Sequence, residues 1–128
     1  MTSRQYDLGG AELEVLKVLW DTGPTTVREV MTQLHDNGRQ VAYTTVQTLL
    51  TRLEQKGYAR SDKSGLAFVY HAKVSRDRVT RYRRKVLLSQ LYDGAAGPLV
   101  LQLVRTEKLT LDEVRELQTL IDELDTGR

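Results

Sequence analysis

The 128-residue chain contains no cysteine, which excludes disulfides, thiol nucleophiles and cysteine-ligated zinc or iron–sulfur sites. It has only two histidines, His35 and His71, and neither stands beside a nucleophile, a base or a phosphate-binding glycine loop in a catalytic pattern. We therefore expect a protein that is not an enzyme, with no catalytic residue, no metal site and no cofactor.

Long apolar segments are also lacking. No apolar run approaches the roughly 20 residues that a membrane-spanning helix needs, and residues 1–10 lack the apolar core of a signal peptide. We expect no direct membrane insertion and a cytoplasmic location, which the absence of cysteine also fits. Apolar residues at 40% and charged residues at 28% are ordinary for a globular chain, and 14.6 kDa leaves room for one domain and an assembly segment.

The net charge is only +2, but it is unevenly distributed. Residues 1–92 carry 15 Lys or Arg against 9 Asp or Glu, whereas residues 93–128 carry 4 against 8. The basic excess is greatest over residues 39–85, with 12 basic side chains and 3 acidic ones. This pattern indicates a part that binds a polyanion and a separate part with another role. An unevenly charged, solvated surface is the alternative.

The predicted elements follow a recognisable order. Periodicity and turn signals predict three helices and then two strands, over about residues 10–21, 27–34, 43–56, 58–61 and 67–72. Thr26 to Glu29 form a capping box for the second helix, and residues 24–26 are compatible with a third short strand. The predicted fold class is mainly α with a small β-hairpin wing: a winged helix-turn-helix followed by a helical dimerisation region.

The helix predicted over 43–56 has two contrasting faces. One narrow stripe is apolar, and the opposite face is polar and carries no acid. Short hydroxyl and amide side chains around an arginine suit the base edges and phosphates of a DNA major groove. The candidate DNA-binding residues, including two from the wing, are Thr44, Thr45, Gln47, Thr48, Thr51, Arg52, Arg60 and Lys63. An ordinary amphipathic helix with a threonine-rich outer face, or a winged helix that binds protein, are the alternatives.

We divide the chain into a DNA-binding domain, 1–74, and a helical linker and dimerisation region, 75–128. The basic helix predicted over 75–92 suits either phosphate contacts or a solvated surface. Helices predicted over 98–107 and from 111 onward carry apolar stripes too large to bury on each other. A second copy is the simplest cover, and folding back onto the winged helix is the alternative. The candidate dimerisation residues are Leu99, Leu103, Leu111, Val114, Leu117, Leu120, Ile121 and Leu124.

Several of these stretches resemble the penicillinase repressor (BlaI/MecI) family. The matching segments are 11–20, 26–30, 42–57, 69–70 and 107–110, and the resemblance extends over about residues 8–124. It implies a homodimeric transcriptional repressor that binds palindromic operator DNA, commonly upstream of β-lactamase or related resistance genes. Two positions differ from the family pattern: Gly9 replaces the usual Ser or Thr helix cap, and Leu66 stands where the wing often has a basic residue.

The resemblance also implies a partner, a membrane-bound sensor with a zinc metalloprotease domain whose activation leads to cleavage of the repressor. The family is cut within the first dimerisation helix at an Asn–Phe bond, and the matching bond here is Gln102–Leu103. A repressor of the same fold released by a small ligand is the alternative. The absence of cysteine argues against the copper-responsive branch of the family.

Overall fold

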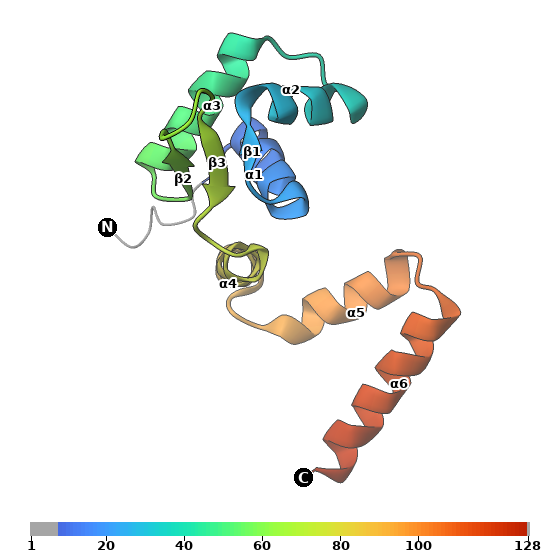
Figure 1. Cartoon of the computed structure of the whole chain (residues 1–128). Helices are drawn as coiled ribbons and strands as arrows, with labels where there is room; N and C mark the ends of the chain where they lie inside the picture. Colours follow the sequence, from blue (N-terminus) through green and yellow to red (C-terminus); the bar gives the residue numbers. More distant parts are fainter. Residues whose placement is uncertain (1–7, 128) are drawn as a thin grey trace. The chain divides into compact units, whose positions relative to one another are not determined.

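The computed structural model describes residues 8–127, which form six helices and three short strands (Figure 1). In chain order they are α1 (Gly10–Thr22), β1 (Thr25–Thr26), α2 (Val27–Asp36), α3 (Tyr43–Gln55), β2 (Ala59–Asp62), β3 (Val69–Ala72), α4 (Arg76–Tyr92), α5 (Ala96–Thr106) and α6 (Leu111–Thr126). The predicted winged-helix order and the short third strand are confirmed. No helix within 8–127 is long and apolar enough to cross a membrane, and the expectation about a signal peptide falls largely on residues 1–7, outside the described residues.

The chain forms two compact units, Met1–Arg84 and Lys85–Arg128, with the boundary inside α4. The first unit holds the whole buried core. The second consists of the end of α4 with α5 and α6, and neither α5 nor α6 has a buried residue. The functional division at residue 74 stays a prediction.

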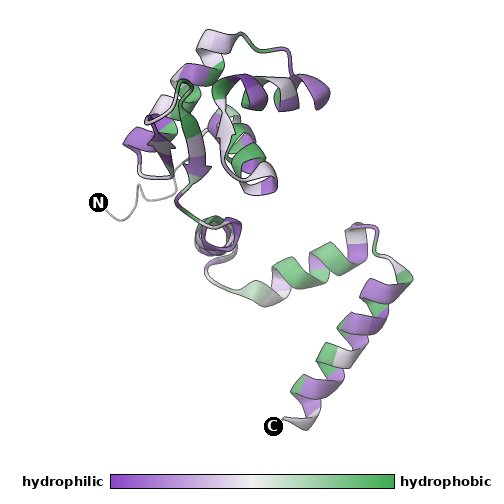
Figure 2. Cartoon of the chain, viewed as in Figure 1, coloured by the Kyte–Doolittle hydropathy of each residue, from purple (hydrophilic) through white to green (hydrophobic). Residues whose placement is uncertain are grey.

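The core of the first unit is built from the inner faces of α1, α2 and α3. Green apolar positions lie along one side of each of these helices in Figure 2. The predicted stripe of α3 is buried as a whole: Val46, Leu49, Leu50 and Leu53 are each 7% exposed or less. These side chains pack in one cluster with Val15, Leu16 and Leu19 of α1. Burial of the stripe fixes which side of α3 faces outward.

The sheet has the strand order β1-β3-β2, and both pairings are antiparallel. Strand β3 pairs along its whole length with β2, from Ala59 opposite Ala72 to Asp62 opposite Val69. The hairpin turn is longer than the sequence pattern predicted. Pairing of β3 with β2 begins at Val69, so Ala67 and Phe68, which were expected to belong to the strand, have no strand partner. The wing therefore ends in an exposed loop over residues 63–68.

Helix ends follow the local capping chemistry. The Thr26 and Thr110 hydroxyls accept hydrogen bonds from the backbone N–H groups of Glu29 and Glu113. In return, the Glu29 and Glu113 carboxylates accept hydrogen bonds from the backbone N–H groups of Thr26 and Thr110. Helix α1 has only half of such a box: the Glu12 carboxylate accepts the Gly9 N–H at 2.9 Å, and glycine has no side chain to reciprocate. Helix α5 begins at Ala96, earlier than predicted from Pro98, because proline is tolerated anywhere in a first helical turn.

A buried carboxylate joins the start of α1 to the end of α3. Glu12 is only 6% exposed and pairs with Lys56 Nζ at 2.8 Å through Oε1, whereas Oε2 is buried without a hydrogen-bond partner. Burial raises the pKa of Glu12, but the hydrogen bonds from Lys56 and Gly9 and the positive charges of Lys56 and Arg52 together hold this pKa below its ordinary value. Glu12 is therefore ionised at neutral pH.

We expect Glu12→Gln to lower the free energy of unfolding by about 1–2 kcal/mol at neutral pH, because the variant loses the charge that pairs with Lys56. Since the folded-state pKa lies below the unfolded one, the contribution of Glu12 is present above the ordinary value of 4.5 and is lost as the pH falls through the folded-state pKa. The difference between wild type and variant should therefore shrink in acid.

Urea unfolding followed by the fluorescence of Trp20, the single tryptophan, measures this difference at each pH. Glu14→Gln is the matched control, because Glu14 is more exposed and pairs with the exposed Arg39. A Glu12→Gln difference that stayed constant from neutral pH to pH values below 4.5 would contradict the assignment.

Candidate nucleic-acid interface

The outer face of α3 carries the predicted contact residues. The structure leaves all six exposed, and together they form one polar side of the helix: Thr44, Thr45, Gln47, Thr48, Thr51 and Arg52. A shallow hollow of about 260 Å³ on this face is lined by Thr44, Thr45, Thr48, Leu49 and Arg52. No acidic side chain lines it. The face therefore presents hydroxyl, amide and guanidinium groups without a competing carboxylate.

Two threonine hydroxyls on this face are already oriented. Thr48 donates to the Thr44 carbonyl and Thr51 to the Gln47 carbonyl, each at 2.9 Å. With its proton used inside the helix, the Thr48 hydroxyl is left as an acceptor, and its methyl group is available for apolar contact. The Thr51 side chain also hydrogen-bonds with Tyr70 of β3. Gln47 and Arg52 retain free donors, so the face offers donors, acceptors and methyl groups, the three kinds of group that read base edges.

The wing adds two exposed basic side chains, Arg60 on β2 and Lys63 in the turn. Lys63 Nζ lies 5.4 Å from the centre of the Phe68 ring, a cation–π distance that holds the ammonium near the end of the wing. Leu66, which stands where the wing of the resembling family often has a basic residue, is fully exposed in the same loop. The wing tip is thus part cationic and part apolar.

Glu54 fastens the wing to the end of α3. Its Oε2 atom accepts the Ser61 hydroxyl at 2.7 Å and the Ser61 N–H at 3.2 Å. The Ser61 hydroxyl lowers the pKa of Glu54, and the Ser61 N–H and Lys63 act in the same direction against a smaller effect of burial. The carboxylate stays charged at neutral pH and maintains the spacing between α3 and β2.

Sequence reasoning missed the contacts that set the start of α3. His35 Nε2 lies 2.9 Å from the Val41 carbonyl, which closes the loop between α2 and α3. The exposed Arg28 guanidinium lies 5.6 Å from the centre of the exposed Tyr43 ring, at the first residue of α3. Arg28 and Tyr43 are therefore further candidates for the interface. In the sequence, the only feature that could have pointed to them is that they lie at the starts of two consecutive helices.

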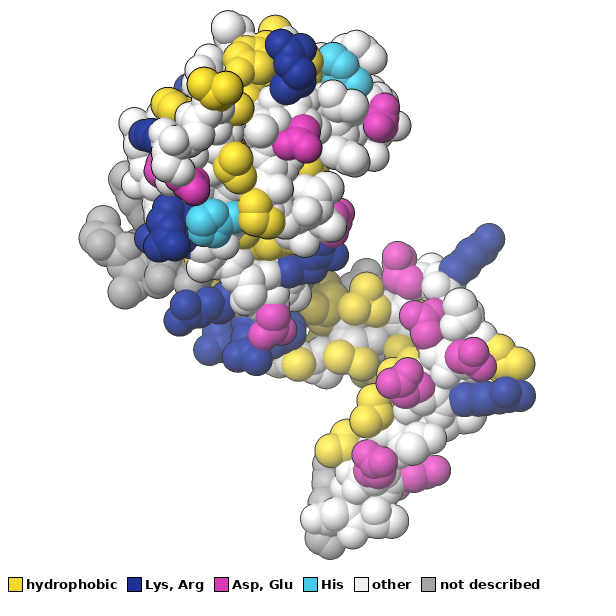
Figure 3. Space-filling model, viewed as in Figure 1, with side chains coloured by type: hydrophobic (Ala, Val, Ile, Leu, Met, Phe, Trp, Pro, Cys, Tyr) yellow, Lys and Arg dark blue, Asp and Glu magenta, His cyan; other side chains and the backbone are white. Residues whose placement is uncertain are grey.

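The basic side chains of α4 gather around that helix in Figure 3. The contacts of its first turn are with α1: Arg76 pairs with Asp21 and lies 5.4 Å from the centre of the Trp20 ring, and Trp20 Nε1 donates to the Val74 carbonyl at 2.8 Å. Arg81 pairs with Asp77 within α4 at 2.9 Å. The suggested phosphate contacts of this helix stay a prediction.

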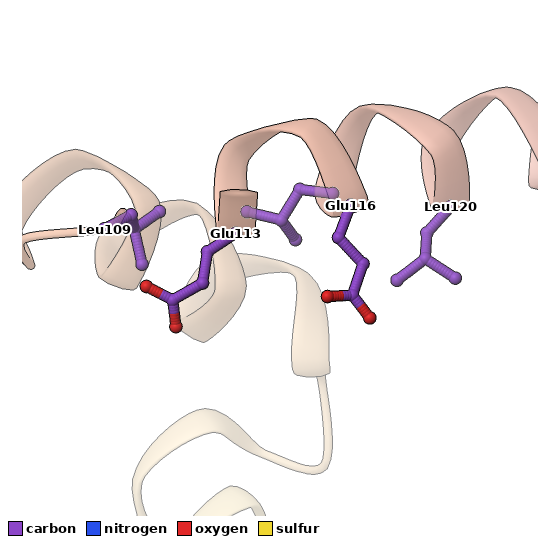
Figure 4. A pocket seen from close by; sticks show the side chains of 5 residues that line it. Leu109, Glu113, Glu116 and Leu120 are labelled. Atoms are coloured by element: carbon purple, nitrogen blue, oxygen red, sulfur yellow. The ribbon is translucent and has the colours of Figure 1, made fainter. Parts of the chain in front are cut away.

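In the second unit, the predicted dimerisation residues lie on solvent-facing stripes. Leu99, Val114 and Leu117 are half-buried, and the other five are exposed: Leu103, Leu111, Leu120, Ile121 and Leu124. Leu109, Leu117 and Leu120 line a hollow of about 250 Å³ whose rim carries Glu113 and Glu116 (Figure 4). In Figure 2, α5 is mostly green and α6 alternates green with purple. Taken by itself, the described part of the second unit thus exposes an apolar surface on α5 and α6.

Within residues 8–127, no cluster of His, Asp or Glu side chains is arranged to hold a metal ion. His35 takes part in the loop contact described above, and His71 lies half-buried on β3.

Comparison with known proteins gives one consistent result. The family model described as "Penicillinase repressor" matches residues 8–123. The penicillinase repressor of Staphylococcus aureus is 26% identical over 97% of this chain and 98% of its own length. The penicillinase repressor of Bacillus licheniformis is 29% identical over 91% of this chain and 90% of its own. The methicillin resistance regulatory protein MecI of Mammaliicoccus sciuri is 27% identical over 95% of this chain and 98% of its own length.

Solved structures agree on the fold. The DNA-binding domain of the repressor BlaI is 33% identical, covering 56% of this chain and 87% of that domain with a TM-score of 0.50. The structure of MarR from E. coli in its oxidised form is 20% identical in sequence. The match covers 92% of this chain and 76% of the MarR chain, with a TM-score of 0.51. The MarR likeness supports the winged-helix fold alone.

Proposed function

The chain belongs to the penicillinase repressor family, and on that basis we propose that it is a homodimeric transcriptional repressor of β-lactam resistance genes that binds palindromic operator DNA. A DNA-bound role implies the cytoplasm and requires no catalytic residue. The observation that carries the proposal is the acid-free, exposed polar face of α3, in a winged helix similar to the DNA-binding domain of BlaI.

The proposed contacts follow from the two surfaces of the winged helix. Helix α3 enters the major groove with Gln47, Thr48 and Arg52 on base edges and neighbouring threonines near phosphates. Arg60 and Lys63 neutralise phosphates beside the groove. The Glu54–Ser61 bonds keep the wing at a fixed distance from α3, so that both surfaces engage one stretch of duplex.

The double variant Gln47→Ala, Thr48→Ala should weaken operator binding by about 1–3 kcal/mol per lost base contact and relax sequence preference in each half-site. Lys63→Gln is the comparison variant, because it should weaken all sequences alike and reduce the salt slope by about one. Fluorescence anisotropy titrations of operator and scrambled duplexes at several salt concentrations give both quantities.

Unchanged operator affinity in the double variant would contradict the assignment of α3. A winged helix that binds protein instead of DNA would show no steep dependence on salt, because a protein interface lacks counterion release on that scale. The salt series therefore separates the two functions.

We assign dimer formation to α5 and α6. Val100, Leu101, Leu103 and Val104 of α5 are each 46–54% exposed, and Leu120, Ile121 and Leu124 of α6 are 49–65% exposed. An apolar surface of this kind on a soluble chain marks an interface. A second copy that presents the same stripe covers both faces at once, and two linked winged helices can then bind two half-sites.

Leu120→Asp should yield a monomer, because burial of one leucine contributes roughly 1.5–3 kcal/mol and two-fold symmetry counts the loss twice. Leu117→Asp should act in the same way. Thr119→Asp is the matched control on the polar side of α6 and should remain dimeric. Sedimentation velocity gives the oligomeric state, and circular dichroism checks that each variant is folded. A wild-type chain that sediments as a monomer at micromolar concentration would refute the interface.

For the end of repression we propose cleavage at the Gln102–Leu103 bond by a membrane-bound metalloprotease sensor. The bond lies in the middle of α5, where Gln102 Oε1 accepts the Tyr92 hydroxyl at 2.9 Å and Leu103 is 46% exposed. A protease needs an extended strand, so α5 must open locally before it is cut. The cut removes α6 and the end of α5, and with them most of the apolar stripe, so the two winged helices lose the gain of linked binding.

Mass spectrometry of the repressor from cells given a β-lactam tests this step. We expect a fragment ending at Gln102 to accumulate with induction. An intact 14.6 kDa chain during full induction would instead favour release by a small ligand.

A further inference from the structure

A second cavity lies on the winged-helix unit, between α1 and the start of α4. Its volume is about 180 Å³, and it is lined by Leu13, Lys17, Trp20, Arg76, Val79, Thr80 and Arg83. Arg76 and Arg83 belong to α4, whose phosphate contacts stay a prediction, and none of the seven residues is among the candidate DNA-binding or dimerisation residues named above. The cavity therefore has no role in the function proposed above.

The floor of the cavity is apolar and fixed in place. Val79 is buried, and Leu13 and Trp20 are half-buried against the core. Trp20 is held by the bond from Nε1 to the Val74 carbonyl and by the Arg76 guanidinium near its ring. A flat apolar body could therefore replace water over this floor without a rearrangement of the core.

The rim is cationic. Arg76 is paired with Asp21, but neither Lys17 nor Arg83 has an ion-pair partner among residues 8–127. No acidic residue lines the cavity. Two unpaired cations beside an apolar floor are complementary to a ligand with an apolar body and one negative group.

We propose that this cavity binds a small carboxylate with a single aromatic ring, the ring against Leu13, Trp20 and Val79 and the carboxylate between Lys17 and Arg83. The size is suitable, because an engineered apolar cavity of about 150 Å³ accommodates benzene. Drug-sized ligands occupy larger pockets, from about 300 Å³ upward, so the volume favours a ligand with a single ring. The proposal does not depend on operator binding.

Trp20, the single tryptophan of the chain, reports occupancy directly. Benzoate titrated into the full-length chain should change the fluorescence of Trp20 in a saturable way, with a dissociation constant on the order of 1 mM, as expected for a ligand of few atoms. Benzyl alcohol keeps the ring without the charge, and acetate keeps the charge without the ring. Both should bind at least about tenfold more weakly.

The double variant Lys17→Gln, Arg83→Gln should weaken benzoate binding at least about tenfold, whereas Arg84→Gln, next to the cavity but not lining it, should bind like the wild type. Line broadening of the benzoate proton resonances gives an independent measure of binding for each variant. No saturable change, equal binding of benzyl alcohol, or equal binding by the double variant would each overturn the proposal. Operator affinity measured without ligand remains a separate result.

Discussion

Burial of one side of α3 is the constraint on which the rest of this structure depends. Val46, Leu50 and Leu53 have no solvent exposure, so α3 has a single rotational setting against α1 and α2. That setting turns the threonines, Gln47 and Arg52 outward. A helix gains most of its stability from such packing, and threonine is a mediocre helix former, so the core supports an outer face that helix propensity alone would not favour.

Two carboxylates fix the position of the C-terminal end of α3 relative to α1 and the wing. Glu12 connects the start of α1 to Lys56, directly after α3, and Glu54 connects the last turn of α3 to Ser61 in β2. Both have lowered pKa values and remain charged at neutral pH. The end of α3 is therefore held from both sides, by α1 and by the wing, while its outer face carries no acid.

Much of this architecture was predictable from the sequence because it depends on local signals. The capping boxes at Thr26 and Thr110 and the apolar stripe of α3 were read from spacing, and the structure has them at those positions. The bonds Glu12–Lys56 and His35–Val41 were not predictable in the same way, since they join residues brought together only by packing. The wing turn was predicted too short, because Ala67 and Phe68 lead directly into the β-prone residues of β3 but have no facing partner strand. The DNA-contact and dimer residues stay predictions.

The separation of the two faces of α3 has an evolutionary consequence. The candidate DNA-contact residues of α3 are all exposed, and none of them belongs to the buried stripe that holds the helix in the core. Under the proposed function, a mutation at Gln47 or Thr48 would change which DNA sequence is preferred at little expense in folding stability, since exposed substitutions are usually tolerated. On that proposal, operator preference and fold would be free to diverge independently, so a lineage of such repressors could acquire new target genes by single substitutions while the scaffold stays constant.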